Sequence, residues 1–247
     1  MKVTIVGSGD AFGTGGRAHT CIRVDSGAGT ALVDFGAGSI VSWQKLGFKV
    51  NDVDLIVISH LHGDHFGGLP FFLLDCQFVS GRTKPLLMIG PPGFKRRLDT
   101  LLETFFPGAM TFKWSFPWQA DEILARRVSK VAGLVVETFE VLHPSGGLAT
   151  GVRLSDGVST FAFSGDTGWT ESLVELSAGA DLFLVECYSG DVPVPNHMDW
   201  PTLKSHVADF TAKQTVLTHL GETALARIPE MEAAGLTIAY DGRTFDL

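Results

Sequence analysis

The 247 residues are 45% hydrophobic and 19% charged, a composition that is typical of a globular protein and excludes a disordered, fibrous or disulfide-stapled chain. The net charge of -8 argues against sequence-independent binding of nucleic acid, which requires a basic face, but is compatible with a small anionic substrate at a site that holds cations. Three widely spaced cysteines, and no apolar run long enough for a signal peptide or a membrane span, predict a cytoplasmic protein.

Short apolar runs bounded by Gly, Asp or Ser predict strands, and the intervals between them contain the expected helices. In the first half, the expected strands are 3–6, 21–24, 31–33, 55–58 and 86–89, and the expected helices are 39–46, 69–79 and 93–106. In the second half, the expected strands are 134–142, 151–154, 159–163, 182–185 and 215–217, and the expected helices are 170–176 and 201–212.

Strand pairs open each half of the chain, and strands and helices alternate after them. This order predicts an α/β fold in which two sheets stack face to face with helices outside, the four-layer αββα sandwich. No polar linker or low-complexity segment divides the halves. We therefore expect one domain over residues 1–247, in which a boundary near residue 130 separates subdomains.

The strongest indication of function directly follows the fourth expected strand, where residues 59–65 read Ser-His-Leu-His-Gly-Asp-His. Alternate residues of an extended segment share a face, so His60 and His62 are expected to converge on one metal ion. Asp64 and His65 lie where the chain turns into a helix, and they are expected to point at a second ion. The alternative, a solvated polar loop, leaves this concentration of metal-binding donors unexplained.

Further candidate ligands follow three later strands. His143 follows the strand that ends at residue 142, Asp166 follows Phe-Ala-Phe-Ser-Gly, and His219 follows Thr-Val-Leu-Thr. Each is the first strong ligand type beyond a buried strand, where an open α/β sheet places its site. A single histidine at a strand end is more often a hydrogen-bonded structural residue. Together with the cluster at 59–65, however, the three complete a set of seven ligands.

This order, His-x-His-x-Asp-His followed by His, Asp and His, resembles the metallo-β-lactamase superfamily over nearly the whole chain. The glycine-rich residues 7–14 and the strand end at 33–36 also resemble the first hairpins of that superfamily. The resemblance implies a metal-dependent hydrolase with two divalent ions, for which zinc is the first expectation and manganese or iron the alternatives. The implied ligands are His60, His62 and His143 for one ion, Asp64, His65 and His219 for the other, and Asp166 as a bridge between them.

The interval 184–200 is similar to the branch that contains ribonuclease Z and the cyclic-phosphate phosphodiesterases. Members of that branch carry a glutamate and a histidine that assist the leaving group, and these match Glu186 and His197. A carboxylate can orient an imidazole, whose ordinary pKa suits proton donation at neutral pH. We expect Asp64, Glu186 and His197 to act in catalysis. The alternative for His197 is a cap on the helix from residue 201, a position that Ser, Thr, Asn or Asp usually takes.

The expected substrate is a small phosphodiester or nucleotide-like molecule. Ribonuclease Z clamps tRNA with a long Gly-rich and basic arm, whereas the interval 81–116 has only scattered basic residues. Together with the acidic net charge, this disfavours tRNA 3′-end processing. The alternatives are a lactone or thioester hydrolase of the same fold, a tRNA 3′-processing endonuclease and a catalytically silent metal-binding module. The resemblance is also compatible with a homodimer, and no membrane partner is expected.

Two further segments have open interpretations. The aromatic-rich residues 105–118 are expected to form a lid over the metals, a part of the core or a dimer surface, because aromatic side chains dominate cores and interfaces alike. The glycine-rich residues 7–16 resemble a phosphate-binding loop but lack the Lys-Ser/Thr ending of a nucleotide P-loop. A tight turn near the site is therefore the expected role of that segment.

Overall fold

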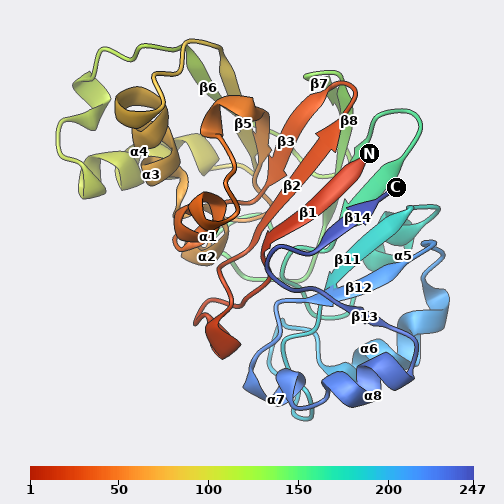
Figure 1. Ribbon diagram of the computed structural model, residues 1–247. Helices are drawn as coiled ribbons and strands as arrows, with labels where there is room; N and C mark the ends of the chain where they lie inside the picture. The colour runs from red at the N-terminus through yellow and green to blue at the C-terminus, as the bar shows by residue number, and fades with distance from the viewer.

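A computed structural model describes residues 1–247 as two seven-stranded sheets that stack face to face between outer layers of helices (Figure 1). In spatial order, the first sheet consists of β14 (Thr244–Asp246), β1 (Lys2–Gly7), β2 (Cys21–Ser26), β3 (Gly29–Val33), β4 (Val53–Val57), β5 (Leu86–Gly90) and β6 (Trp118–Glu122). The second consists of β13 (Thr237–Ile238), β12 (Thr215–Thr218), β11 (Leu182–Glu186), β10 (Thr160–Phe163), β9 (Thr150–Ser155), β8 (Leu134–Glu140) and β7 (Val128–Val131). The predicted α/β sandwich is confirmed.

Each sheet combines antiparallel hairpins with a parallel part. β1, β2 and β3 pair antiparallel, and β3 to β6 pair parallel. Likewise β7 to β10 pair antiparallel, and β10 to β13 pair parallel. The C-terminal strand β14 pairs with β1, so the two termini lie side by side (Figure 1). Because parallel strands end at the same edge of a sheet, the polar segments that follow them are gathered there.

The strands are almost continuously apolar because both of their faces are covered. In β4, Leu55 and Val57 belong to the cluster between the two sheets, whereas Ile56 belongs to the cluster under the outer helices. In β11, Leu184 faces the inner cluster and Phe183 the outer one. This period of two places successive side chains in different layers of the sandwich.

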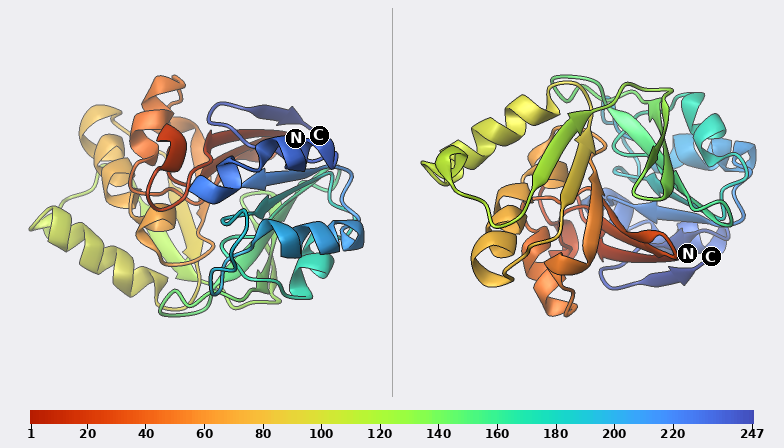
Figure 2. Two further views of the ribbon diagram at one scale, coloured as in Figure 1. Left: turned by 90° about the horizontal axis from the view of Figure 1, so that it is seen from below. Right: turned by 90° about the horizontal axis from the view of Figure 1, so that it is seen from above.

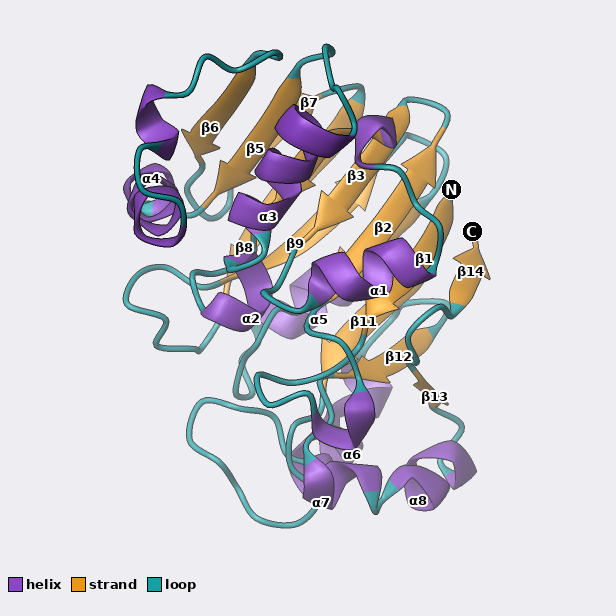
Figure 3. Ribbon diagram, turned by 60° about the vertical axis from the view of Figure 1, so that its left-hand side comes forward, coloured by secondary structure: helices purple, strands orange, loops and turns teal.

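The helices cover the outer faces of the two sheets (Figures 2 and 3). The first sheet is covered by α1 (Ser39–Lys45), α2 (Gly63–Phe66), α3 (Leu69–Leu74) and α4 (Phe94–Phe105). The second sheet is covered by α5 (Ser172–Ser177), α6 (Trp200–His206), α7 (Glu222–Leu225) and α8 (Ile228–Ala233). A π-helical turn at Asp75–Val79 follows α3, and short 3-10 turns occupy Thr14–Gly16, Val50–Asp52, Ala109–Thr111 and Val207–Asp209. None of the helices has the combined length and apolar character that crossing a membrane requires.

Four strands were not predicted from the sequence, and all four lie at the edges of the sheets. They are β6, β7, β13 and β14. An edge strand has one unpaired side and often carries polar residues, so its sequence lacks the apolar run of an interior strand. In β6, for example, only Ala120 of five residues is buried. The expected helix 201–212 is also shorter than predicted, because α6 ends at His206 and the chain is extended at Phe210.

Arg82 joins the starts of β4 and β5 from a buried position and yields a prediction about stability. Its guanidinium donates to four main-chain carbonyls at 2.6–2.9 Å, those of Val50, Val53, Lys84 and Pro85. Arg82→Met keeps an unbranched chain but leaves these oxygens without a donor. We expect the free energy of unfolding to fall by about 3 kcal/mol or more. Denaturation in guanidinium chloride measures the change. Arg96→Met on the exposed face of α4 is the matched control, and equal midpoints for the two variants would contradict the prediction.

Candidate metal centre

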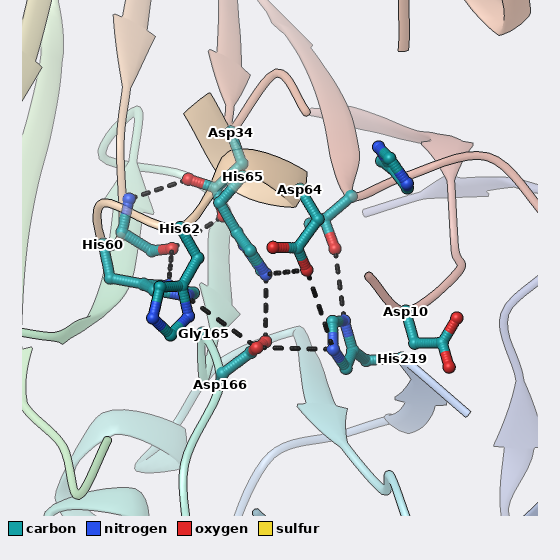
Figure 4. Close-up of polar contacts among 12 residues, drawn as sticks. Asp10, Asp34, His60, His62, Asp64, His65, Gly165, Asp166 and His219 are labelled. Atoms are coloured by element: carbon teal, nitrogen blue, oxygen red, sulfur yellow. Dashed lines mark hydrogen bonds and ion pairs between the residues drawn. The ribbon is translucent and has the colours of Figure 1, made fainter. Parts of the chain in front are cut away.

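The seven candidate ligands lie close together. Figure 4 labels six of them, all except His143. The seven come from five places: His60 and His62 after β4, Asp64 and His65 in α2, His143 after β8, Asp166 after β10 and His219 after β12. Their donor atoms form two groups, within each of which all atoms lie within 4.8 Å of one another: His60, His62, His143 and Asp166, and then Asp64, His65, His219 and Asp166. The structure thus brings together all seven predicted residues, and Asp166 belongs to both groups.

Local chain geometry explains why neighbours in sequence divide between the two groups. His62 has an extended backbone, with φ −85° and ψ 151°, so His60 and His62 stay on one face with their rings 4.9 Å apart. The helix α2 then begins at Gly63 and turns Asp64 and His65 toward the second group. The loop after β3 packs tightly on this turn, because a Cβ atom at Gly36 would lie only 2.0 Å from the carbonyl oxygen of Asp64.

Several donor atoms at the centre are buried without a hydrogen-bond partner in the protein. These atoms are His60 Nε2, Asp64 Oδ2, His65 Nε2 and Asp166 Oδ1. Buried polar groups in proteins are nearly always paired, so unpaired donors that converge on one small volume indicate an electropositive occupant. Imidazole nitrogen and carboxylate oxygen are ligands that divalent transition-metal ions accept. The residues present therefore fit divalent metal ions.

The charges at the centre also favour a cation. Burial and the neighbouring His65 lower the pKa of His60 well below its usual value, which leaves a neutral imidazole. Burial opposes ionisation of Asp166, but the imidazoles of His219 and His65 outweigh it, and its pKa lies well below the usual range. Burial likewise disfavours a charged His65, yet the carboxylates of Asp166, Asp64 and Asp34 raise its pKa. The carboxylates thus stabilise a positive charge at this place. A divalent ion supplies such a charge, and it binds to neutral imidazoles and ionised carboxylates.

Oxygen atoms outside the centre orient most of the candidate histidines through Nδ1. His65 Nδ1 lies 2.7 Å from Asp34 Oδ2, His143 Nδ1 lies 3.0 Å from the carbonyl oxygen of Asn196, and His60 Nδ1 lies 3.1 Å from Ser59 Oγ. Such contacts leave Nε2 available to a metal and hold the plane of the ring. His62 differs, because its Nδ1 lies 3.0 Å from His143 Nε2 and so faces the centre itself.

The backbone adopts a left-handed conformation where two loops reach the centre. His219 has a φ of 59°, a left-handed conformation that costs energy for a residue with a side chain, and its N–H donates to the carbonyl of Ser8 at 3.0 Å. Gly165 has a φ of 62°, and a Cβ atom there would lie 2.8 Å from the carbonyl oxygen of Thr150. These conformations direct His219 and the neighbouring Asp166 inward from the ends of β12 and β10.

Glu186 and His197 form a pair beside the centre. Glu186 is fully buried at the end of β11, where its Oε1 makes a close contact with His197 Nδ1 and its Oε2 accepts a hydrogen bond from Thr167 N–H at 2.5 Å. Burial and the carboxylate of Asp166 raise the pKa of Glu186 to about 7. Burial opposes the charged form of His197, but the contact with Glu186 raises its pKa. Its ring lies 4.8 Å from that of His143, so this pair adjoins the first group.

His197 does not cap the following helix, which was the alternative interpretation of this residue. The cap of α6 is Asp199, whose side chain accepts a hydrogen bond from Thr202 N–H at 2.9 Å. His197 instead lines a cavity of about 300 Å³ over the candidate metal centre. The other lining residues are Ala11, Phe12, His62, Asp64, Asp166, Tyr188, Val194 and His219. This volume is at the small end of the range for ligand pockets, roughly 300–1,000 Å³.

The aromatic segment 105–118 does not line that cavity. Phe116 is buried in the outer core of the first sheet, and four neighbours pack against the same cluster: Phe106, Phe112, Trp114 and Trp118. The three interpretations of this segment were a lid, a part of the core and a dimer surface. For these residues, the structure shows packing onto the core. The glycine-rich residues before β2 do reach the site, because Ala11 and Phe12 line the cavity and Gly13 turns the chain with a φ of 65°.

Comparison with known families identifies the chain. The model of the family described as anti-Pycsar protein Apyc1 matches residues 1–241. The chain belongs to this family. The match to the anti-Pycsar protein Apyc1 family includes every candidate ligand as well as Glu186 and His197. It therefore covers both the centre and the pair beside it.

This member of the anti-Pycsar protein Apyc1 family also resembles a wider group of proteins. Ribonuclease Z of Methanococcus maripaludis strain C6 is 33% identical over 155 residues, which are 60% of this chain and 47% of that protein. Ribonuclease Z of Clostridium kluyveri is 37% identical over 93 residues, 38% of this chain and 30% of that protein. The matches thus span less than half the length of these relatives. The predicted metallo-β-lactamase superfamily and its ribonuclease Z branch are confirmed.

The fold agrees with that assignment over the full chain. The short form of human tRNase Z has a TM-score of 0.81 at 22% identity and covers 100% of this chain, which in turn covers 99% of that structure. The metallo-β-lactamase fold protein YhfI of Bacillus subtilis has a TM-score of 0.80 at 21% identity, with 99% of both chains covered. At these identities the likeness shows the fold alone.

Several residues of the site were not predicted from the sequence of this Apyc1 family member, and Asp34 and Phe12 are two of them. Asp34 is fully buried, has a φ of 60° and contacts both His65 and Ser59, whose N–H and Oγ donate to it at 2.7 and 2.6 Å. The sequence analysis noted that the strand end at 33–36 resembles the first hairpins of the superfamily, but this resemblance assigned no role to Asp34. Phe12 lies in the glycine-rich segment and lines the cavity. The sequence predicted only a tight turn for that segment and no role for Phe12.

Asp34→Asn is expected to weaken metal binding about 10- to 100-fold, because outer partners of metal-binding histidines commonly contribute that much. The amide keeps a similar shape but removes the negative charge beside His65 Nδ1. Competition with a chromophoric chelator measures the affinity. Asp25→Asn is the matched control, since Asp25 pairs with Arg23 on the first sheet and contacts none of the candidate ligands. Equal metal affinity in the two variants would show that Asp34 has no such role.

Proposed function

We propose that the chain is a metal-dependent phosphodiesterase that hydrolyses a small phosphodiester or nucleotide-like substrate. The observation that carries the proposal is the combination of a seven-donor centre with the Glu186–His197 pair in one cavity of about 300 Å³. Relatives named ribonuclease Z, and solved structures described as a diphosphatase of the PhnP family and as yeast PDE1, support a reaction at a phosphate group.

Two divalent ions fit the donor set, with zinc as the first choice and manganese or iron as alternatives. His60, His62 and His143 would hold one ion, Asp64, His65 and His219 the other, and Asp166 both. Ions bound in this way supply an activated water at neutral pH and stabilise negative charge on the phosphate. Asp64 thus contributes to catalysis through its place in the second group.

The residues of the chain complete the reaction by moving a proton. Glu186 holds His197 at Nδ1, so the remaining ring nitrogen is the one available to the cavity. That nitrogen would donate a proton to the oxygen that leaves the phosphorus, as a general acid does. Thr167 N–H fixes the second oxygen of Glu186, so the carboxylate stays in place as the proton moves. A buried carboxylate of this kind also stabilises the imidazolium before transfer.

The size of the cavity and the charge of the chain support a small substrate over tRNA. A net charge of -8 disfavours a long polyanion, whose binding depends on many basic contacts. Nucleic acid nevertheless belongs in the test, because the relatives named ribonuclease Z share the branch. A cytoplasmic location and the absence of a membrane partner remain expectations from the sequence, as does a homodimer.

The test begins with elemental analysis of protein purified without chelator, followed by a substrate screen. We expect hydrolysis of bis-p-nitrophenyl phosphate and of cyclic mononucleotides. Turnover of lactones or thioesters without phosphodiester turnover would replace the proposal by a carbonyl hydrolase. Cleavage confined to precursor tRNA would indicate a processing nuclease. Metal binding with no hydrolysis in the zinc, manganese, iron or cobalt form would indicate a catalytically silent module.

A further inference from the structure

The cavity over the candidate metal centre is lined by two kinds of residue. One part consists of the metal-binding side chains and His197. The other part is apolar and comes from Ala11, Phe12, Val194 and the ring of Tyr188. A molecule that fills such a cavity combines an anionic group with an apolar group, because each part of the wall then meets matching chemistry. The apolar part takes no place in the hydrolysis described above.

Phe12 is unusually exposed for a large aromatic residue. Its exposed fraction is 81%, although Asp10, two residues before it, is 1% exposed. An aromatic ring in water contributes nothing to the hydrophobic core, so its position at the cavity has no explanation in the stability of the fold. Single exposed apolar residues are common on protein surfaces, but this one lines the cavity that contains the candidate centre.

The loop that carries Phe12 is held in one conformation. Asp10 accepts hydrogen bonds from the N–H groups of Phe12 and Thr14 at 3.2 and 2.9 Å and from Thr14 Oγ1 at 2.6 Å. The base of the loop is closed by Asp241, which accepts from the N–H groups of Ser8 and Ala18 at 2.9 and 2.7 Å. A loop whose main chain is already ordered loses little conformational entropy when a ligand packs on the residue that it carries.

Tyr188 supplies a second aromatic ring to the same cavity. It lies two residues beyond the end of β11, and its ring lies 4.8 Å from that of His197 and 6.2 Å from that of His219. Its carbonyl accepts a hydrogen bond from Gly221 N–H at 3.0 Å, so the main chain at this point is also fixed. The cavity thus has one aromatic ring from each half of the sandwich.

We propose that Phe12 and Tyr188 form a stacking subsite for a flat, unsaturated ring carried by the substrate, such as a nucleobase. This inference rests on the proposed function, because the ring belongs to a phosphodiester whose phosphate lies at the metal centre. Aromatic faces bind flat rings better than they bind compact aliphatic groups, since the two surfaces match in shape and in electrostatic quadrupole. Phe12 is then a residue that selects substrates by the group attached to the phosphate.

Kinetics with paired substrates test the subsite. The pair is adenosine 3′,5′-cyclic phosphate and the same cyclic ribose phosphate with hydrogen in place of the base. In Phe12→Ala, we expect KM for the nucleotide to rise about tenfold and KM for the base-free diester to stay unchanged. Phe12→Trp restores the ring and should restore the low KM. Phe78→Ala, at a residue with 64% exposure on the π-helical turn, is the matched control outside the cavity.

Calorimetry with two monophosphates separates the failure of this inference from the failure of the proposed function. Wild-type protein should bind AMP about tenfold more tightly than ribose 5-phosphate, and Phe12→Ala should lose that preference. If neither diester is hydrolysed but the AMP preference depends on Phe12, the subsite stands and the phosphodiesterase proposal falls. If phosphodiesters are hydrolysed but Phe12→Ala affects both members of each pair equally, or neither, the stacking subsite is overturned.

Discussion

His62→Ala is expected to lower the metal content of the protein and to reduce turnover of bis-p-nitrophenyl phosphate by roughly 10³-fold or more. His62 shares the first group with His60, His143 and Asp166, and it is the histidine of that group that also lines the cavity. Loss of an outer partner of a metal ligand commonly costs 10- to 100-fold, so loss of a ligand itself should cost more. Elemental analysis and steady-state kinetics measure the two effects.

His206→Ala provides a matched histidine control for that prediction. His206 contacts Asp209 and stacks on Trp169, away from both groups of donors. Its removal should leave metal content and turnover unchanged. Both variants should show a cooperative unfolding transition, which excludes general misfolding as the cause. Full activity in a His62→Ala protein that contains no metal would refute the proposed mechanism.

The candidate centre was largely predictable from the sequence because each ligand occupies a local position with a simple geometric meaning. His60 and His62 are two residues apart in an extended segment and therefore share a face. His143, Asp166 and His219 follow buried strands, and the sheet topology brings those strand ends together. Pattern and spacing identify these positions without knowledge of any long-range contact.

Asp34 and Phe12 escaped prediction because their roles depend on contacts that spacing does not encode. Asp34 precedes His65 by 31 residues, and the contact between them forms only when the loop after β3 packs onto α2. The position of Phe12 depends on hydrogen bonds made by Asp10 within a turn whose conformation the glycines permit but do not specify. Such residues become visible only when the loops are placed in three dimensions.

The strands of the fold likewise divide into predictable interior strands and edge strands that were not predicted. Interior strands such as β4 and β11 are buried on both faces and were recognised by their apolar runs. The edge strands were not predicted because each has one unpaired side and often carries polar residues, so its sequence lacks a continuous apolar run. The sequence also could not decide whether the aromatic residues around Phe116 are buried or exposed. Burial of an aromatic cluster depends on how it packs in three dimensions and not on composition.

His197→Ala is expected to leave the metal content intact and to lower kcat by about 10²- to 10⁴-fold for an ester with an alkyl leaving group. His197 belongs to neither group of metal donors that contains His60 or His65, and its contact with Glu186 holds it beside them. An alkoxide is a strong base and leaves slowly without a proton. Loss of the general acid should therefore appear in kcat for such a substrate.

The leaving group distinguishes proton donation from a structural role of His197. p-Nitrophenolate is a weak base that leaves without a proton, so His197→Ala should retain most of its activity toward bis-p-nitrophenyl phosphate. Glu186→Gln keeps a hydrogen-bonding group at Nδ1 but removes the charge that stabilises the imidazolium, and it should follow the same trend with a smaller loss. A general distortion of the site would slow both substrates equally. Equal losses, or loss of metal from His197→Ala, would therefore assign His197 to the structure of the centre and not to the transfer of a proton.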